Sequence, residues 1–80
     1  MMNDRLAIRE FFQMLLSRNN DRADFLDSEL LAENGRLQSI DMLEVVIFLE
    51  ERYEIDLVKI GFDQSQIGSI DNIMVTIGRK

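Results

Sequence analysis

Apolar residues recur at helical spacing in the first part of the chain. Between residues 4 and 17 they fall at positions that share one face of a helix, namely Ile8, Phe11, Phe12, Leu15 and Leu16. Asn3 or Asp4 can cap this helix, because a short side-chain oxygen accepts a first-turn N–H. The pattern predicts a first helix over residues 4–17.

Two further segments repeat this helical pattern. Residues 39–53 predict a second helix with these positions inward: Ile40, Leu43, Val46, Ile47, Leu49 and Tyr53. Its acidic residues are expected to face outward, namely Asp41, Glu44, Glu50 and Glu51. Residues 70–77 predict a last short helix on Ile70, Ile73, Met74 and Ile77, with Ser69 as its cap.

The remaining segments read as connections. Residues 18–24 form a polar loop, and Asn34-Gly35 predicts a turn. Apolar anchors of the long first loop are Phe25, Leu26, Leu30 and Leu31. Residues 54–62 alternate like a strand, but a strand without a partner is unstable, so an extended connector is expected. Its anchors are Ile55, Leu57, Ile60 and Phe62. Residues 63–67 predict one helical turn.

These elements predict an all-α fold in one domain, residues 1–80: a small four-helix bundle of three main helices and a short third one. Ile40, Val46, Ile47, Phe62, Ile67 and Ile70 are expected in its core. Whether some of them also line a cavity for an apolar guest stays open.

Composition excludes several classes of function. The 80 residues carry 9 basic and 15 acidic side chains, net charge −6, which argues against a nucleic-acid partner. The chain has no Cys and no His, so disulfides, thiolate metal sites and a Ser-His nucleophile pair are excluded. We therefore expect a protein that is not itself an enzyme.

Neither a membrane span nor a metal site is expected. The longest apolar run, residues 45–49, is too short to cross a bilayer. The first residues lack the layout of a signal peptide, so the cytoplasm is the expected compartment. A calcium loop starting at Asn19, with Asp21 and Asp24, fails because its sixth residue is Asp24 and its twelfth is Leu30.

Ser39 stands at the predicted start of the second helix. It suits an N-cap, although Met42, three residues later, completes no capping box. The same helix start also favours a phosphate group, because unpaired N–H groups and the positive end of the helix dipole lie there. Without a histidine the serine cannot activate itself, so another enzyme must do any chemistry on it.

The stretch GRLQSIDMLEVVIFLEERYEIDL resembles the acyl and peptidyl carrier proteins. Their signature of Gly-x-Leu-Asp-Ser-Leu, followed by an acidic and apolar helix, is matched by Gly35, Leu37, Ser39, Ile40, Leu49, Glu50, Glu51, Tyr53 and Ile55. Residues 67–73, IGSIDNI, are similar to the Phe-x-Thr-Ile-x-x-Ile segment of the family. The resemblance covers about residues 30–78.

This resemblance implies a bundle like that of acyl carrier proteins, in which Ser39 carries a 4′-phosphopantetheine arm taken from coenzyme A. A magnesium-dependent phosphopantetheinyl transferase attaches the arm, whose thiol then carries an acyl or aminoacyl group as a thioester. The implied pathways are fatty acid, polyketide or other specialised biosynthesis. The implied partners, besides the transferase, are loading and condensing enzymes with basic patches, and a monomer is expected.

The second helix is the implied docking surface, through Gln38, Ile40, Asp41, Glu44, Ile47, Glu50 and Glu51. Like charges at Asp41 and Glu44 repel each other, so their clustering does not help the fold. Gln38 departs from the family, whose aspartate there helps to place magnesium, because a neutral amide is a poorer ligand. The alternative function is an acidic helical adaptor in which Ser39 is only a cap and no arm is carried.

Overall fold

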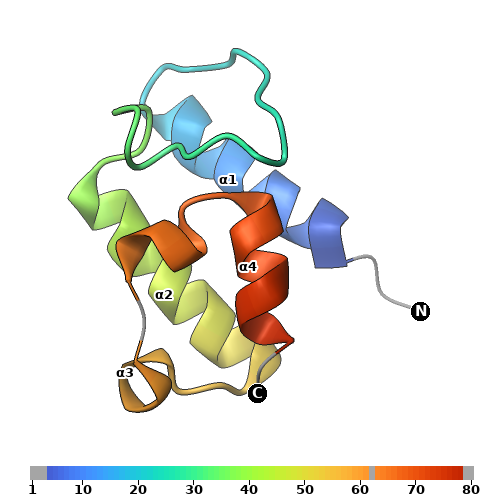
Figure 1. Cartoon of the computed structure of the whole chain (residues 1–80). Helices are drawn as coiled ribbons and strands as arrows, with labels where there is room; N and C mark the ends of the chain where they lie inside the picture. Colours follow the sequence, from blue (N-terminus) through green and yellow to red (C-terminus); the bar gives the residue numbers. More distant parts are fainter. Residues whose placement is uncertain (1–3, 62, 79–80) are drawn as a thin grey trace.

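Five helical segments follow one another along residues 4–61 and 63–78, which the computed structural model describes (Figure 1). They are α1 (Asp4–Arg18), α2 (Ser39–Tyr53), α3 (Leu57–Ile60), the 3₁₀ turn η1 (Gln64–Ile67) and α4 (Ile70–Ile77). These residues contain no strand. The prediction of a small all-α bundle is therefore confirmed for the described part of the chain, with α1, α2 and α4 as its three main helices.

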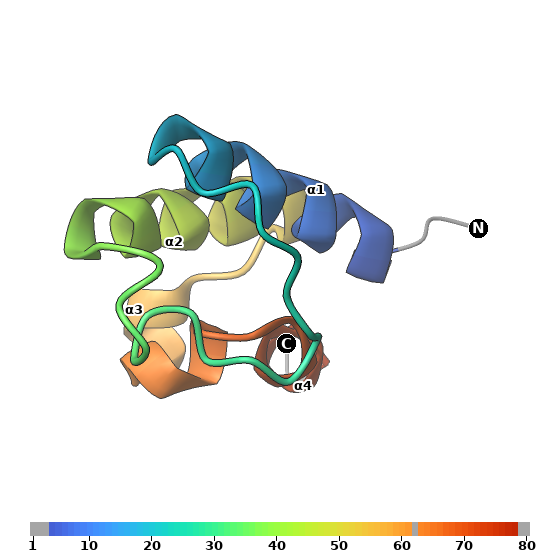
Figure 2. The same ribbon diagram turned by 90° about the horizontal axis from the view of Figure 1, so that it is seen from above.

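The helices form two layers around one core. Figure 2 shows α1 and α2 side by side in one layer, with α3, η1 and α4 in the other. Buried apolar residues come from both layers: Ile8, Phe12, Leu15, Leu16, Met42, Val45, Leu49, Leu57, Ile67, Ile70, Ile73 and Ile77. The predicted inner faces of the first and last helices are thus largely confirmed, with Phe11 and Met74 partly buried against this core.

The predicted inner face of α2 is wrong at three positions. Ile40 is 59% exposed, Leu43 54% and Ile47 46%. Leu49 is buried as predicted, Met42 and Val45 make the rest of the core side of α2, and Val46 and Tyr53 are partly buried. The predicted set was too wide to fit one side of a helix, so the contacts with α1 and η1 decide which part of it is covered.

The connector after α2 contains the short helix α3, where an extended segment was predicted. The Asp56 side chain accepts the N–H of Lys59 at 3.0 Å and so caps α3. Ile55 and Leu57 are buried, as expected for anchors. Phe62 and the side chain of Ile60 lie outside the described residues. The predicted turn over residues 63–67 is confirmed as η1.

The caps and turns follow their local chemistry. Ser69 accepts the N–H of Asn72 at 3.1 Å, which confirms it as the cap of α4. Gly35 has a φ of 84°, a backbone conformation that glycine adopts without strain, so the predicted turn is confirmed there. Phe25 and Leu31 are buried as predicted, but Leu26 is exposed and Leu30 only half-buried.

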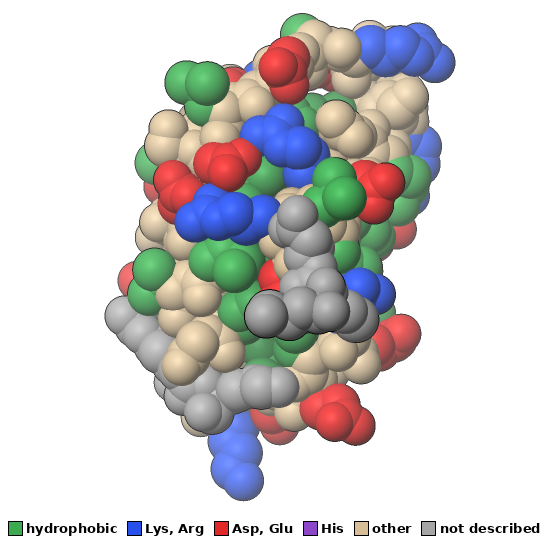
Figure 3. Space-filling model, turned by 90° about the vertical axis from the view of Figure 1, so that its right-hand side faces the viewer, with side chains coloured by type: hydrophobic (Ala, Val, Ile, Leu, Met, Phe, Trp, Pro, Cys, Tyr) green, Lys and Arg blue, Asp and Glu red, His purple; other side chains and the backbone are tan. Residues whose placement is uncertain are grey.

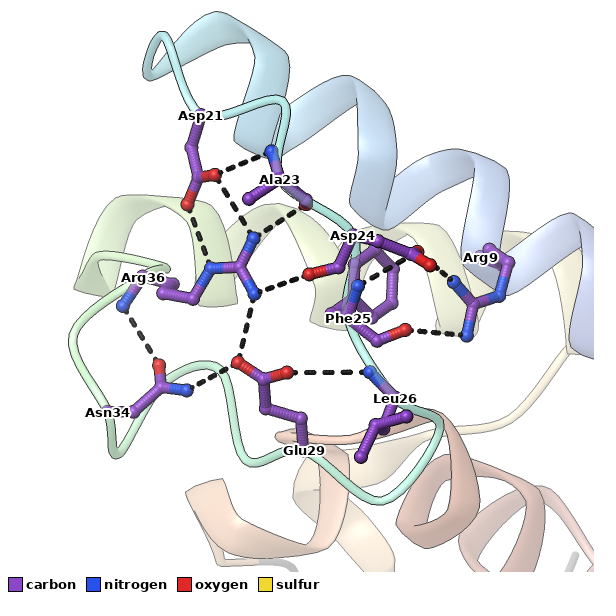
Figure 4. Close-up of polar contacts among 9 residues, drawn as sticks. All are labelled: Arg9, Asp21, Ala23, Asp24, Phe25, Leu26, Glu29, Asn34 and Arg36. Atoms are coloured by element: carbon purple, nitrogen blue, oxygen red, sulfur yellow. Dashed lines mark hydrogen bonds and ion pairs between the residues drawn. The ribbon is translucent and has the colours of Figure 1, made fainter.

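Arg36 holds the long first loop in shape (Figure 4). Its guanidinium donates to the Asp21 carboxylate at 2.8 and 3.0 Å and to Glu29 at 2.9 Å. It also donates to the backbone carbonyls of Ala23 at 2.7 Å and Asp24 at 3.1 Å. The hydrogen bonds from Arg36 hold the pKa of Asp21 and of Glu29 below the ordinary range. One side chain, three residues before Ser39, therefore gathers the loop that leads into α2.

Two arginines of α1 fix the other end of this loop. Arg9 donates to the carbonyl of Phe25 at 3.1 Å and lies 4.4 Å from the centre of its ring. Arg5 donates to Asp27 at 2.9 Å and to Asp71 of α4 at 2.7 Å. On the side of the molecule drawn in Figure 3, basic side chains lie directly beside acidic ones. Much of the charge is therefore compensated within the fold.

Candidate functional site

Ser39 is the first residue of α2 and its side chain is exposed. The N-cap position belongs to Gln38, whose φ of −94° and ψ of 170° are those of extended backbone. Its carbonyl accepts the N–H of Met42 at 3.0 Å, which is the first bond of the helix. The interpretation of Ser39 as the helix cap is therefore wrong by one residue.

The Asp41 carboxylate completes the cap of α2 by accepting a backbone N–H. The prediction that Asp41 faces outward as a docking residue is therefore wrong. Its side chain is only 1% exposed, and it accepts the N–H of Gln38 at 2.9 Å. It also accepts from the Asn19 amide at 2.7 Å and from Arg18 at 3.0 Å. A capping box does exist, but it runs from Gln38 to Asp41 and not from Ser39 to Met42.

This environment keeps Asp41 ionised. Burial alone raises the pKa of a carboxyl group, but the hydrogen bonds from Gln38, Asn19 and Arg18 outweigh it and hold the pKa of Asp41 below the ordinary range. The start of α2 is thus tied to the end of α1 through a buried charge. Sequence reasoning missed Arg18, because its partners lie 23 and 26 residues further on.

Glu44 is not a free docking charge. Arg18 donates to one of its carboxylate oxygens at 3.0 Å and also binds the other. These hydrogen bonds hold the pKa of Glu44 below its usual range and raise that of Arg18. Arg18 therefore compensates the two acidic side chains nearest to Ser39, which the sequence presented as an acidic face.

The other predicted docking residues remain at the surface. Gln38 and Glu51 are exposed, and Glu50 is half-buried and accepts the N–H of Leu57 at 3.1 Å. Ile40 and Ile47 lie with Leu43 along one exposed side of α2. Beside Ser39 the outer surface of α2 is therefore mainly apolar.

An open groove of about 280 Å³ lies between α2 and η1 and includes Ser39 in its lining. Its lining is mainly apolar and comes from α2 and η1: Ser39, Met42, Leu43, Val46, Gln64 and Ile67. Of the residues considered for a cavity, Val46 and Ile67 do line it. Ile70 is instead in the core, and Ile40 and Ile47 do not line this groove.

The residues considered for calcium have other partners. Asn19 donates to Asp41, Asp21 accepts from Arg36, and Asp24 accepts from Arg9 at 3.3 Å. In residues 4–61 and 63–78, no group of three acidic side chains is placed to hold a metal ion.

Comparison with known proteins gives no relative: no family model, no curated protein and no solved structure matches the chain. None of the helices in the described residues has both the length and the apolar character needed to cross a membrane.

Proposed function

We propose that the chain is a carrier protein that bears an acyl or aminoacyl group on a 4′-phosphopantetheine arm attached to Ser39. The observation that carries this proposal is the position of Ser39. The residue is exposed, it is free of the capping role, and it stands at the mouth of an apolar groove. The resemblance of residues 30–78 to acyl and peptidyl carrier proteins supports the same function.

The surroundings of Ser39 fit such a group. The first N–H groups of an α-helix have no partner inside the helix, so a phosphodiester on Ser39 lies where the backbone favours negative charge. The groove offers apolar side chains such as Leu43 and Val46 to the arm or its cargo. When bound, the arm supplies the thiol for a thioester, which this chain without cysteine lacks.

The surface residues proposed for docking suit an enzyme that acts on the group carried by the arm. Exposed Ile40 and Ile47 follow Ser39 along α2 and present apolar surface. Glu51 adds negative charge further along the helix, which suits a basic partner. A loading or condensing enzyme with a basic patch is thus the proposed partner class, besides the transferase that attaches the arm.

The proposal is tested by intact-protein mass spectrometry after incubation with coenzyme A, magnesium and a broad-specificity transferase. The wild type should gain the mass of one phosphopantetheine, and Ser39→Ala should gain none. Because Ser39 is exposed and caps nothing, this variant should keep its free energy of unfolding within about 0.5 kcal/mol. A mass gain that persists in Ser39→Ala contradicts the proposal.

Gln38→Asp is expected to speed arm attachment roughly ten-fold, by analogy with other groups that support a metal site. The Gln38 side chain is exposed beside Ser39, and a carboxylate there offers the ligand that magnesium prefers. The measurement is the initial rate of mass gain at fixed magnesium. Gln38→Asn is the matched control, since asparagine is as good an N-cap as aspartate but brings no charge. Equal rates for both variants refute the metal explanation.

A further inference from the structure

The acidic residues of α2 are not equally available to a partner. Asp41 is buried, both oxygens of Glu44 are bound by Arg18, and Glu50 accepts a backbone N–H of α3. Glu51 is exposed, and no hydrogen bond or ion pair joins its side chain to another residue in the described part of the chain. The charge that a partner can reach therefore lies about three turns from Ser39 and not beside it.

A second groove, of about 260 Å³, leads to this free carboxylate. It lies between α1 and α2 and is lined by Phe11, Glu44, Ile47, Phe48 and Glu51. The rings of Phe11 and Phe48 are stacked, with centroids 4.2 Å apart and planes inclined by 12°. The groove thus combines an aromatic wall with one compensated and one free carboxylate.

We propose that this groove holds one arginine side chain from the partner enzyme. The aliphatic part of the arginine lies against the rings of Phe11 and Phe48, and its guanidinium pairs with Glu51. This site deepens the proposed function, on which it rests for the identity of the partner. It also gives docking a direction: apolar residues of the partner lie near Ser39 and Ile40, and its arginine lies at the far end of α2.

The chemistry of the groove selects this occupant. Long basic side chains bury their aliphatic stems on apolar surface and keep the charge in water, which an open groove with a carboxylate at its rim allows. Arginine fits better than lysine, because its planar group pairs with a carboxylate through two parallel hydrogen bonds. Arg52 already lies 6.0 Å from the centre of the Phe48 ring. Binding therefore depends on the stem contacts and on Glu51, and not on a cation above that ring.

Arg18 prevents the partner's arginine from pairing with Glu44, the other carboxylate of the groove. It occupies both oxygens of Glu44, so a second guanidinium arriving there must displace it or face its positive charge. The two carboxylates of one groove thus differ in a way that substitution can measure.

The test is an NMR titration of the unmodified protein with a synthetic amphipathic helical peptide that carries one arginine beside leucines. A second peptide, with citrulline in place of the arginine, keeps the shape and removes the charge. The arginine peptide should shift the amide signals of Phe11, Ile47 and Phe48 and bind more tightly than the citrulline peptide. Because the protein carries no arm, the result is readable whether or not arm attachment succeeds.

Glu51→Gln and Glu44→Gln form the matched pair, since each removes one negative charge from the same groove. Glu51→Gln should weaken the arginine peptide roughly two- to five-fold, as expected for an exposed ion pair, and Glu44→Gln should weaken it clearly less. Equal weakening by both variants overturns the proposal in favour of diffuse charge attraction. Equal binding of the two peptides, or no shifts in the groove, overturns it as well.

Discussion

Asp41→Ala is expected to lower the free energy of unfolding by about 3 kcal/mol, because it removes a helix cap and a buried carboxylate that accepts hydrogen bonds from three residues. Its carboxylate accepts from Gln38, Asn19 and Arg18, and its side chain is almost completely buried. The measurement is chemical unfolding at neutral pH, followed by helical circular dichroism. Glu51→Ala is the control, an exposed carboxylate of the same helix.

The same carboxylate gives a pH dependence with a defined sign. The pKa of Asp41 is lowered in the folded chain, so its stabilisation is complete above the unfolded value of about 3.9. It is lost as the pH falls through the lower, folded value. The stability of Asp41→Ala should therefore fall less steeply than that of the wild type below about pH 4. Parallel pH profiles of the two proteins would mean that Asp41 is not held as the structure places it.

Arg36→Ala is expected to lower the free energy of unfolding by about 2 kcal/mol, because several charge-assisted hydrogen bonds are lost at once. Arg36 joins Asp21, Glu29 and two backbone carbonyls of the loop, and its side chain is 18% exposed. Amide exchange in residues 21–36 should become faster, since the loop loses the group that gathers it.

Arg22→Ala separates this effect from the loss of a positive charge. Arg22 is an exposed arginine of the same loop, so its removal changes the net charge equally but should alter stability by less than about 0.5 kcal/mol. Arg36→Lys tests the geometry, because lysine keeps the charge without the planar fork. Equal stability of Arg36→Ala and Arg22→Ala contradicts the role given to Arg36.

The regular part of the fold could be predicted from local pattern. The bounds of α2 and α4 match the prediction because apolar spacing is clear there and polar residues flank both helices. α1 extends one residue further than predicted, to Arg18. The short helix α3 could not be predicted, because four residues carry no period. Its stability comes from contacts of Asp56 and Glu50 with backbone N–H groups.

The candidate site was predicted less well, because its electrostatics are tertiary. The spacing from Gln38 to Asp41 is visible in the sequence, but a capping box counted from Ser39 ends at Met42, whose side chain cannot complete it. No local signal links Arg18 to Glu44, which comes 26 residues later. The acidic face therefore seemed free in the sequence, although the fold compensates the half nearest to Ser39.

The two functions considered from the sequence give Ser39 different roles. The adaptor hypothesis uses the surface of α2 and gives Ser39 only the role of a helix cap. In the structure, Gln38 and Asp41 fill that role together. The carrier proposal accounts for an exposed serine, the neighbouring apolar groove and the docking surface together.

The most direct test of the carrier proposal locates the added group on the chain. Cleavage by trypsin after Arg36 and Arg52 releases residues 37–52, a peptide whose only serine is Ser39. After treatment with coenzyme A, magnesium and a panel of transferases, this peptide should carry the full mass of one phosphopantetheine. The peptides with Ser17, Ser28, Ser65 and Ser69 should be unchanged. An arm on one of those peptides, or no arm with any transferase of the panel, contradicts the proposal.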